Sequence, residues 1–200
     1  MGQIFRRVEP YLDNLGVGIW VEIGASVNGI DSPTSALAQW SKSYGKHFTT
    51  IDVDPDKCAV VRDFNLDIEV VNSTGEDYLR QFPKHIGYIS LLYLDGLDWN
   101  WHPMAEEGYT LDLKRDYRER FGMDMTNINS QQQHLNQAML AMPCMAPTSI
   151  VVCDHTWFDE HWGHYSGKGG AVIPLLLNNG FRIVYQQPYP VYGVILGRGF

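Results

Sequence analysis

Short apolar stretches that alternate with helix-patterned segments are the feature that most constrains the fold of this 200-residue chain. Such alternation predicts βαβ units, in which parallel strands are joined by crossover helices that cover both faces of a sheet. The predicted strands are Gly18–Ile23, Phe48–Val53, Ile68–Val71, Ile86–Leu94 and Ser149–Cys153. The predicted helices are Thr34–Tyr44, Lys57–Asn65, Glu76–Phe82 and Asn129–Met142.

The carboxyl-terminal part of the chain departs from this alternation. Gly169–Asn179 has a helical pattern that ends at Gly180, and two strand-like stretches follow, Phe181–Gln187 and Val191–Arg198. The residues between these stretches, 188–190, are too few for the crossover that parallel strands need, so the pair is predicted to be an antiparallel hairpin. The sequence therefore predicts an α/β fold of the Rossmann-like, doubly wound type. Its seven-stranded sheet is mostly parallel and ends in a C-terminal antiparallel hairpin.

Length and charge narrow the possible functions. With 44% apolar residues the chain is large enough for one core, so residues 1–200 are predicted to form a single domain. The net charge of −8 speaks against a nucleic-acid partner, because affinity for phosphates comes chiefly from Lys and Arg. No apolar run approaches the ~18 residues of a membrane span. We expect a cytoplasmic protein that acts on a small molecule, without a nucleic-acid or membrane partner, and leave a homo-oligomer open.

The ends of the first three predicted strands carry the residues of a nucleotide-type site, because ligands of an open parallel sheet bind there. The first strand leads into VEIGASVNG (Val21–Gly29), where Gly24 allows close approach of a ligand to the backbone. Asp52 ends the second strand and is placed to bind a ribose diol. The alternative is that Asp52 and Asp54 only open a turn. The polar turn Asn72–Asp77 after the third strand suits an adenine edge.

Acidic groups end the next two strands. Asp95 follows the fourth strand, and Asp154 and His155 follow the fifth. Because these strands are expected to be neighbours, the three side chains should converge on one point. Buried carboxylates need a partner, since an unpaired buried charge is costly.

The order VEIG…TIDVDP…NSTGEDYL…LLYLDG…VVCDH…KGGAVIPLLLNNGF…VYGVILGR resembles the class I S-adenosylmethionine-dependent methyltransferases. The resemblance extends from Gly18 to Arg198 and includes the terminal hairpin. It is closest to the divalent-cation-dependent small-molecule O-methyltransferases of the catechol and macrolide-sugar types. The resemblance implies transfer of a methyl group from S-adenosyl-L-methionine to a hydroxyl of a small-molecule acceptor.

The resemblance also implies roles for individual residues. Asp95, Asp154 and His155 would hold Mg²⁺ or Mn²⁺, since imidazole is compatible with the softer metal. The implied cofactor-binding residues are Glu22, Gly24 and Ser26 along the methionine part, Asp52 at the ribose, Gly75 and Glu76 beside the adenine, and Asp95, which would also bind the metal.

The catalytic candidates are His155, His102 and Asp98, the last of which stands where the catechol type has a lysine. The insertion at about 99–127 is expected to be a lid or substrate wall, with a solvated surface excursion as the alternative. The loop Asp154–Gly170, rich in His and Trp, is either a second lid with an aromatic wall or a plain surface loop. If these loops form an aromatic wall, the acceptor is expected to be aromatic or sugar-like.

Two other functions stay open at this point. One is a non-catalytic binding or scaffold protein that keeps the methyltransferase fold. The other is a metal-free methyltransferase in which His155 is the base and Asp154 orients it.

Overall fold

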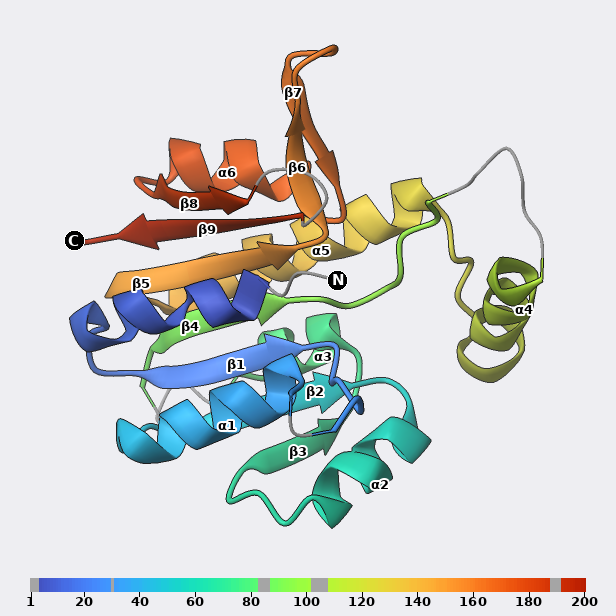
Figure 1. Cartoon of the computed structure of the whole chain (residues 1–200), viewed down its shortest axis with the longest axis horizontal. Coiled ribbons are helices and arrows are strands. Elements are labelled where there is room, and N and C mark those ends of the chain that lie inside the picture. Colours follow the sequence, from blue (N-terminus) through green and yellow to red (C-terminus); the bar gives the residue numbers. More distant parts are fainter. Residues whose placement is uncertain (1–3, 30, 83–86, 102–107, 188–191) are drawn as a thin grey trace.

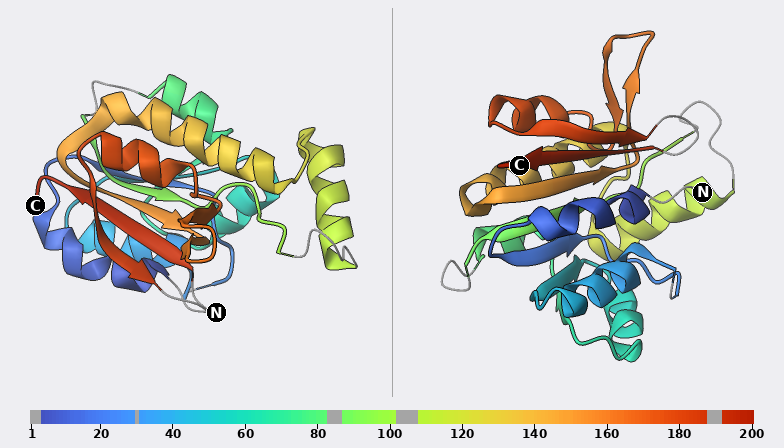
Figure 2. Two further views of the ribbon diagram at one scale, coloured as in Figure 1. Left: turned by 90° about the horizontal axis from the view of Figure 1, so that it is seen from above. Right: turned by 60° about the vertical axis from the view of Figure 1, so that its left-hand side comes forward.

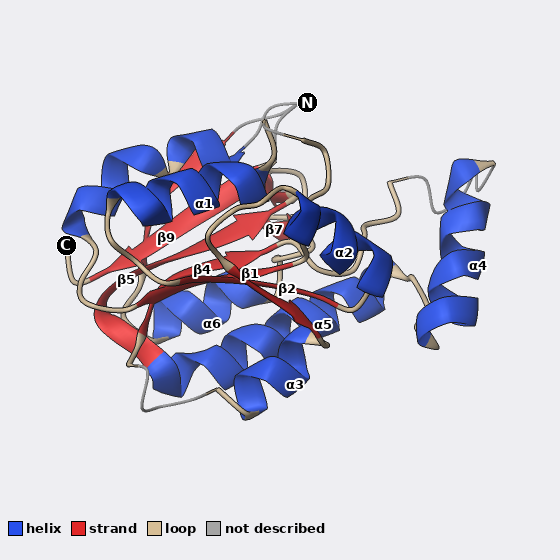
Figure 3. Cartoon of the chain, turned by 90° about the horizontal axis from the view of Figure 1, so that it is seen from below, coloured by secondary structure: helices blue, strands red, loops and turns tan. Residues whose placement is uncertain are grey.

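A seven-stranded sheet with helices on both faces forms the centre of the molecule (Figure 1 and Figure 3). The computed structural model describes residues 4–29, 31–82, 87–101, 108–187 and 192–200. The strands are β1 (Ile19–Ile23), β2 (Phe48–Asp52), β3 (Glu69–Asn72), β4 (Ile89–Leu94), β5 (Met145–Asp154), β8 (Arg182–Gln187) and β9 (Gly193–Arg198). The helices are α1 (Pro33–Ser43), α2 (Pro55–Asp63), α3 (Gly75–Arg80), α4 (Tyr109–Phe121), α5 (Asn127–Ala141) and α6 (Val172–Asn178), with short 3-10 turns η1 (Ile4–Arg7), η2 (Glu9–Asn14) and η4 (Met142–Cys144).

The strand order is β3-β2-β1-β4-β5-β9-β8. Strands β1 to β5 pair in parallel, whereas β9 runs antiparallel to both β5 and β8. This confirms the predicted doubly wound α/β fold with its antiparallel terminal hairpin.

Side chains of the central strands alternate between two hydrophobic cores, because successive residues of a strand point to opposite faces. Trp20 and Tyr93 pack with α1, η1 and η2 on one face. Val21 and Leu92 pack with α3, α5 and α6 on the other. All four side chains are buried, so the sheet is covered on both sides and only its ends and loops can hold a ligand.

The helices begin where the sequence places capping residues. The Ser32 side chain accepts a hydrogen bond from the Ser35 N–H, with Pro33 as the first residue of α1. Asp54 caps α2 in the same way, by accepting from the Asp56 N–H. Side-chain oxygens at such positions satisfy amide groups that have no partner within the helix. The role of Asp54 is therefore at least partly that of a helix cap.

Two strands occur where the sequence predicts only a loop. β6 (Thr156–Asp159) and β7 (His164–Gly167) form an antiparallel hairpin that projects from the end of the main sheet (Figure 1). Each strand has four residues and is partly exposed, so its alternation is too short to be distinguished from a polar loop. The hairpin follows β5 directly.

Helix α4 lies within the insertion, and it stands apart from the sheet in Figure 1 and in the left view of Figure 2. A small separate cluster that includes Leu97, Tyr117 and Met125 holds it. Among the described helices none is long and apolar enough to cross a membrane.

Gly24 marks the closest approach between the turns after β1 and β4. Its φ is +98°, and a Cβ at this position would overlap the backbone carbonyl of Asp95. Gly29 has a similar φ of +79° but has open space around it.

We expect Gly24→Ala to lower the free energy of unfolding by about 3 kcal/mol or more, because strain and overlap add. Gly29→Ala should cost about 1 kcal/mol, from the positive φ alone. Urea denaturation of both variants measures the difference. Equal losses would show that the contact with Asp95 is not what requires glycine.

Candidate cofactor and catalytic site

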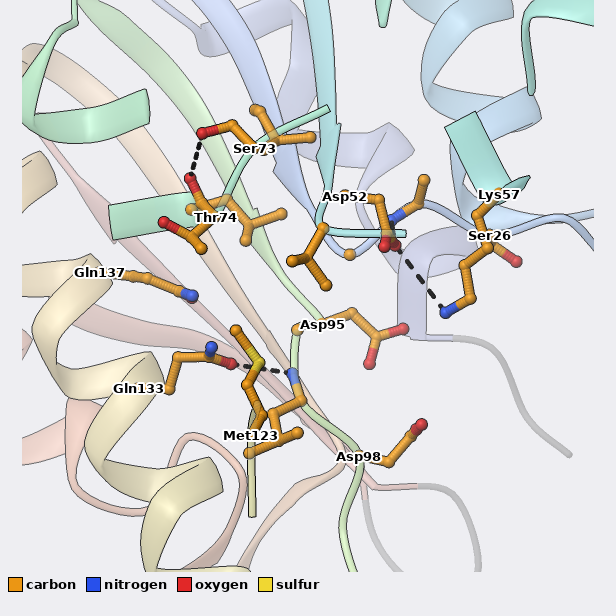
Figure 4. Close-up of a pocket in the computed structure, with 18 of the residues that line it drawn as sticks. Ser26, Asp52, Lys57, Ser73, Thr74, Asp95, Asp98, Met123, Gln133 and Gln137 are labelled. Carbon is orange, nitrogen blue, oxygen red and sulfur yellow. Dashed lines mark hydrogen bonds and ion pairs between the residues drawn. The ribbon is translucent and has the colours of Figure 1, made fainter. Parts of the chain in front are cut away.

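A cavity of about 380 Å³ lies at the carboxyl ends of β1, β2 and β4 (Figure 4). Its volume is within the usual range of small-molecule sites, about 300 to 1,000 Å³. The predicted site residues that line it are Gly24, Ser26, Asp52, Gly75, Asp95, Asp98 and His155. Glu22, Glu76 and Asp154 are not part of the lining, and His102 lies outside the described residues.

Glu22 lies beneath the turn that follows β1. Its side chain is fully buried, and Oε2 accepts hydrogen bonds from the hydroxyls of Thr34 and Thr50, at 2.7 and 2.6 Å. The Thr34 oxygen in turn accepts from the Ser26 N–H at 2.8 Å. Glu22 thus orders the Ser26 turn through α1, and does not itself face the cavity.

Burial is the main reason why the pKa of Glu22 rises to about 8, and the nearby carboxylates of Asp95 and Asp52 add to the effect. The two threonine hydroxyls oppose it but do not compensate. At neutral pH the buried group is therefore mostly protonated. The bound proton neutralises the Glu22 carboxyl, which has no positively charged partner among the described residues to do so.

Asp52 links the turns after β1 and β2. Its Oδ2 accepts from the Ala25 N–H at 2.9 Å and its Oδ1 from the Asp54 N–H at 2.8 Å. The Lys57 ammonium lies 3.8 Å from Oδ2. Burial raises the pKa of Asp52, although Lys57 and both N–H groups oppose this. The carboxylate is held rigidly at the cavity wall.

The turn after β3 contributes Ser73, Thr74 and Gly75 to the cavity, as its polar sequence predicts. Glu76 is not part of the lining, and its Oε2 accepts from the Gln137 Nε2 at 3.2 Å. Gln137 and Gln133, four residues apart on α5, reach the lining instead (Figure 4). Nothing in their spacing distinguishes them from ordinary polar helix residues in the sequence.

Asp95, Asp154 and His155 converge as predicted, with one ligand atom of each within 4.8 Å of the others. The His155 Nδ1 lies 3.4 Å from Oδ1 of Asp95 and 3.4 Å from Oδ1 of Asp154. Oδ1 of Asp154 accepts from the His155 N–H at 2.7 Å. Oδ2 accepts from the Tyr93 hydroxyl at 2.5 Å.

His155 has a positive φ of 48°, which is rare for a residue with a side chain. Strained conformations of this kind cluster at functional sites, where the surrounding structure enforces them. Burial would lower the pKa of His155, but contact with Asp95 and attraction by both carboxylates outweigh it, and the pKa is raised above 6.5.

Lys168 completes this cluster and is the main functional candidate that sequence reasoning missed. Its side chain is 2% exposed, and Nζ lies 2.6 Å from Oδ1 of Asp95 and 3.9 Å from Oδ1 of Asp98. Burial would raise the pKa of Asp95, but Lys168 and His155 outweigh it and hold that pKa well below its ordinary value. The available signal was a single lysine between glycines in SGKGG, close to the acids.

The cluster does not fit a divalent cation well. Oδ1 of Asp95 already accepts from Lys168, and the two oxygens of Asp154 accept from Tyr93 and the His155 N–H. A cation bound to Asp95 would also face the buried ammonium at short range, and like charges repel strongly in a buried site. The three predicted ligands come together, but a positive charge is already among them.

An aromatic wall adjoins His155. The Trp101 ring stacks on Trp157 and Tyr192, with centroids 5.5 and 5.2 Å apart, and lies 5.7 Å from the imidazole. Trp99 packs edge-on against Trp157 at 6.0 Å. Trp99 and Trp101 of the insertion therefore meet Trp157 of the loop Asp154–Gly170 beside His155.

Helix α4 reaches the cavity through Tyr117, whose hydroxyl donates to Asp98 Oδ2 at 3.1 Å. Arg120 fastens the same helix to the start of α2, with Nη2 2.7 Å from both Asp54 and Asp56. The described part of the insertion thus contributes Tyr117 and Met123 to the lining.

Replacing Glu22 by Gln should stabilise the protein increasingly as pH rises. The unfolded state loses its proton near pH 4.5 and the folded state near pH 8, so wild-type stability falls by about 1.4 kcal/mol per pH unit in between. The neutral amide has no such loss and can still accept from both threonines. We expect Glu22→Gln to gain on the order of 3 kcal/mol between pH 5 and pH 8, measured by urea denaturation. A difference independent of pH would contradict a protonated Glu22.

Comparison with known proteins finds similarity in structure alone. No family model and no curated protein matches the chain. A Streptococcus mutans protein in complex with SAH superposes with a TM-score of 0.59 at 10% identity, covering 100% of this chain and 99% of that one. The N-methyltransferase NodS of Bradyrhizobium japonicum with S-adenosyl-L-homocysteine gives 0.53 at 15% identity, covering 98% and 86%. A SAM-dependent methyltransferase of Bacteroides fragilis gives 0.53 at 12%, covering 100% and 78%. At such low identity these likenesses establish a shared fold.

Proposed function

We propose that the protein is an S-adenosyl-L-methionine-dependent methyltransferase that acts on a hydroxyl of a small molecule. The observation that carries the proposal is the charge of the cavity. Asp52, Asp95 and Asp98 line it, Lys57 is the single lysine among the described lining residues, and Lys168 pairs with Asp95 from outside the lining (Figure 4). An acidic site suits a cofactor with a sulfonium and an ammonium group, and it repels the pyrophosphate of a dinucleotide. Neighbours with the same fold were solved with S-adenosyl-L-homocysteine.

The residues around the cavity suit this cofactor. We assign the methionine part to the turn of Gly24 and Ser26, and the ribose to Asp52, at the ends of β1 and β2. The adenine then lies near Gly75 and the α5 glutamines. Asp95 lies between these parts and can face the sulfonium. When bound, the cofactor supplies an activated methyl group.

His155 is the base in this proposal. Two carboxylates face its buried Nδ1, so a neutral ring keeps its proton on that nitrogen and has its lone pair on Nε2. The ring is 35% exposed and lines the cavity, so its other edge is accessible from there. Nε2 would accept the proton of the acceptor hydroxyl and make its oxygen a stronger nucleophile toward the methyl group that the bound cofactor would supply, with S-adenosyl-L-homocysteine as the leaving group. Asp154 and Asp95 stabilise the imidazolium that results.

The aromatic wall is the proposed binding surface for the acceptor, which we take to be an aromatic or sugar-like molecule. Trp101 and Trp157 offer flat apolar faces next to His155.

In the same proposal the whole chain acts as one domain. The insertion 99–127 acts as a lid whose helix α4 is held closed by Arg120.

Cofactor binding is tested by isothermal titration with S-adenosyl-L-homocysteine. We expect saturable binding to the wild type, and Asp52→Asn should weaken it by about 10- to 100-fold, because a charged hydrogen-bond acceptor is lost. Asp112→Asn is the matched control, since it removes a similar charge from an exposed i,i+3 pair with Arg115. Absence of any binding by the wild type would favour the alternative of a non-catalytic scaffold protein.

Turnover is tested with His155→Asn, because Asn tolerates a positive φ and preserves the fold. We expect kcat to fall by about 10² to 10⁴ while cofactor affinity stays within a few-fold. The wild-type rate should rise with pH through a pKa above 6.5, the pKa of His155, and this rise should disappear in the variant. An unchanged pH profile would exclude His155 as the base.

A cation-assisted reaction, with Mg²⁺ or Mn²⁺ held by Asp95, Asp154 and His155, is the competing form of this proposal. Treatment with EDTA separates the two, because only the cation-assisted form loses activity.

An amine acceptor is the second candidate substrate, since NodS is an N-methyltransferase. Acceptor screens should therefore include aromatic and sugar amines beside the hydroxyl compounds.

A further inference from the structure

We propose that Lys168 is a built-in cation that takes the place of a divalent metal in the acid cluster. The cluster then binds no metal in the native protein, and becomes a metal site only when the lysine charge is removed. This inference concerns the cluster itself and does not depend on which cofactor fills the cavity.

The first observation is the position of the ammonium group. Nζ of Lys168 lies 2.6 Å from Asp95 Oδ1 and also donates to the Gly96 carbonyl at 3.3 Å. Asp98 is 3.9 Å away. A group that sits among carboxylates and a carbonyl oxygen occupies the kind of oxygen-lined position that a hard divalent cation prefers.

The second observation is that the lysine cannot easily leave. Only 2% of it is exposed, so a metal that displaced it would leave a buried ammonium without its counter-ion. Lys168 also lacks a solvent route of the kind that lets exposed lysines turn away from a bound cation. Metal binding therefore has to overcome both repulsion and the loss of the existing ion pair.

The third observation is that the backbone is built to hold the lysine there. The Lys168 N–H donates to the carbonyl of His155 at 3.0 Å, where the chain leaves the β6–β7 hairpin. Gly167 has a φ of +85°, and a Cβ on it would overlap that same His155 carbonyl. The side chain is thus anchored at its base beside His155 and at its tip on the turn after β4.

Charge balance explains why removing the lysine should create a metal site. Asp95, Asp154 and His155 lie within 4.8 Å of one another, and Tyr93 and the His155 N–H hold Asp154, so we expect the three groups to stay together without the Lys168 charge. Without the ammonium, the two carboxylates lack a cation. The oxygen of Asp95 that Lys168 occupied becomes available, and a neutral imidazole is a third ligand that Mn²⁺ accepts.

The test is a titration of the full chain with Mn²⁺ alone. Electron paramagnetic resonance of the free ion measures how much Mn²⁺ is bound. We expect no saturable binding to the wild type up to about 1 mM. Lys168→Met should bind one Mn²⁺ at least about tenfold more tightly. Lys168→Arg is the matched control, since it keeps the charge and should show no gain.

A double variant locates the new site. Lys168→Met combined with Asp95→Asn should lose the gain, because the freed carboxylate is removed. If Lys168→Met does not fold, as judged by circular dichroism, Lys168→Gln offers a polar replacement of similar length. The titration of the wild type tests, whichever variant folds, whether the native cluster binds no metal.

Three outcomes would overturn the inference. The first is stoichiometric Mn²⁺ binding by the wild type. The second is a folded Lys168→Met or Lys168→Gln that gains no affinity, and the third is a gain that persists in the double variant. None of these measurements uses S-adenosyl-L-methionine, so failure here is distinct from failure of the proposed methyltransferase function.

Discussion

The buried ion pair between Lys168 and Asp95 joins two parts of the site that are far apart in the chain. Asp95 lies in the turn after β4, and Lys168 follows the hairpin β6–β7, yet Nζ and Oδ1 are 2.6 Å apart. The pair neutralises part of a cluster that also holds Asp154 and His155. Because Asp95 lines the cavity and His155 borders the aromatic wall, this contact joins the cavity to that wall.

A second buried group organises the opposite side of the cavity. Glu22 binds two threonine hydroxyls, and through Thr34 it fixes the amide of Ser26. The two networks meet at Gly24, which packs on the carbonyl of Asp95. Rigid positioning of this kind is what the proposed methyl transfer would require of the protein, since orientation of the reacting groups contributes much of the rate.

Much of the site was predictable from residues at strand ends. The convergence of Asp95, Asp154 and His155, and the placement of Asp52 at the cavity, follow from parallel strands that end at one edge of the sheet. Glu22 was expected along the cofactor, but its side chain is fully buried beneath the turn that follows β1, because alternate residues of a strand point to opposite faces. The hairpin β6–β7 was missed because its four-residue strands have no distinct period.

The sequence by itself determined the doubly wound fold, because apolar strands, helix caps and the short terminal connection are local signals that leave few topologies. Only the tertiary structure decided how the acid cluster is neutralised. Lys168 and Asp95 are 73 positions apart, and neither residue carries a local pattern that names its partner. Whether a carboxylate binds a metal, a proton or an ammonium depends on what the fold brings within a few ångströms. That information lies in the packing of the chain, not in the spacing of its residues.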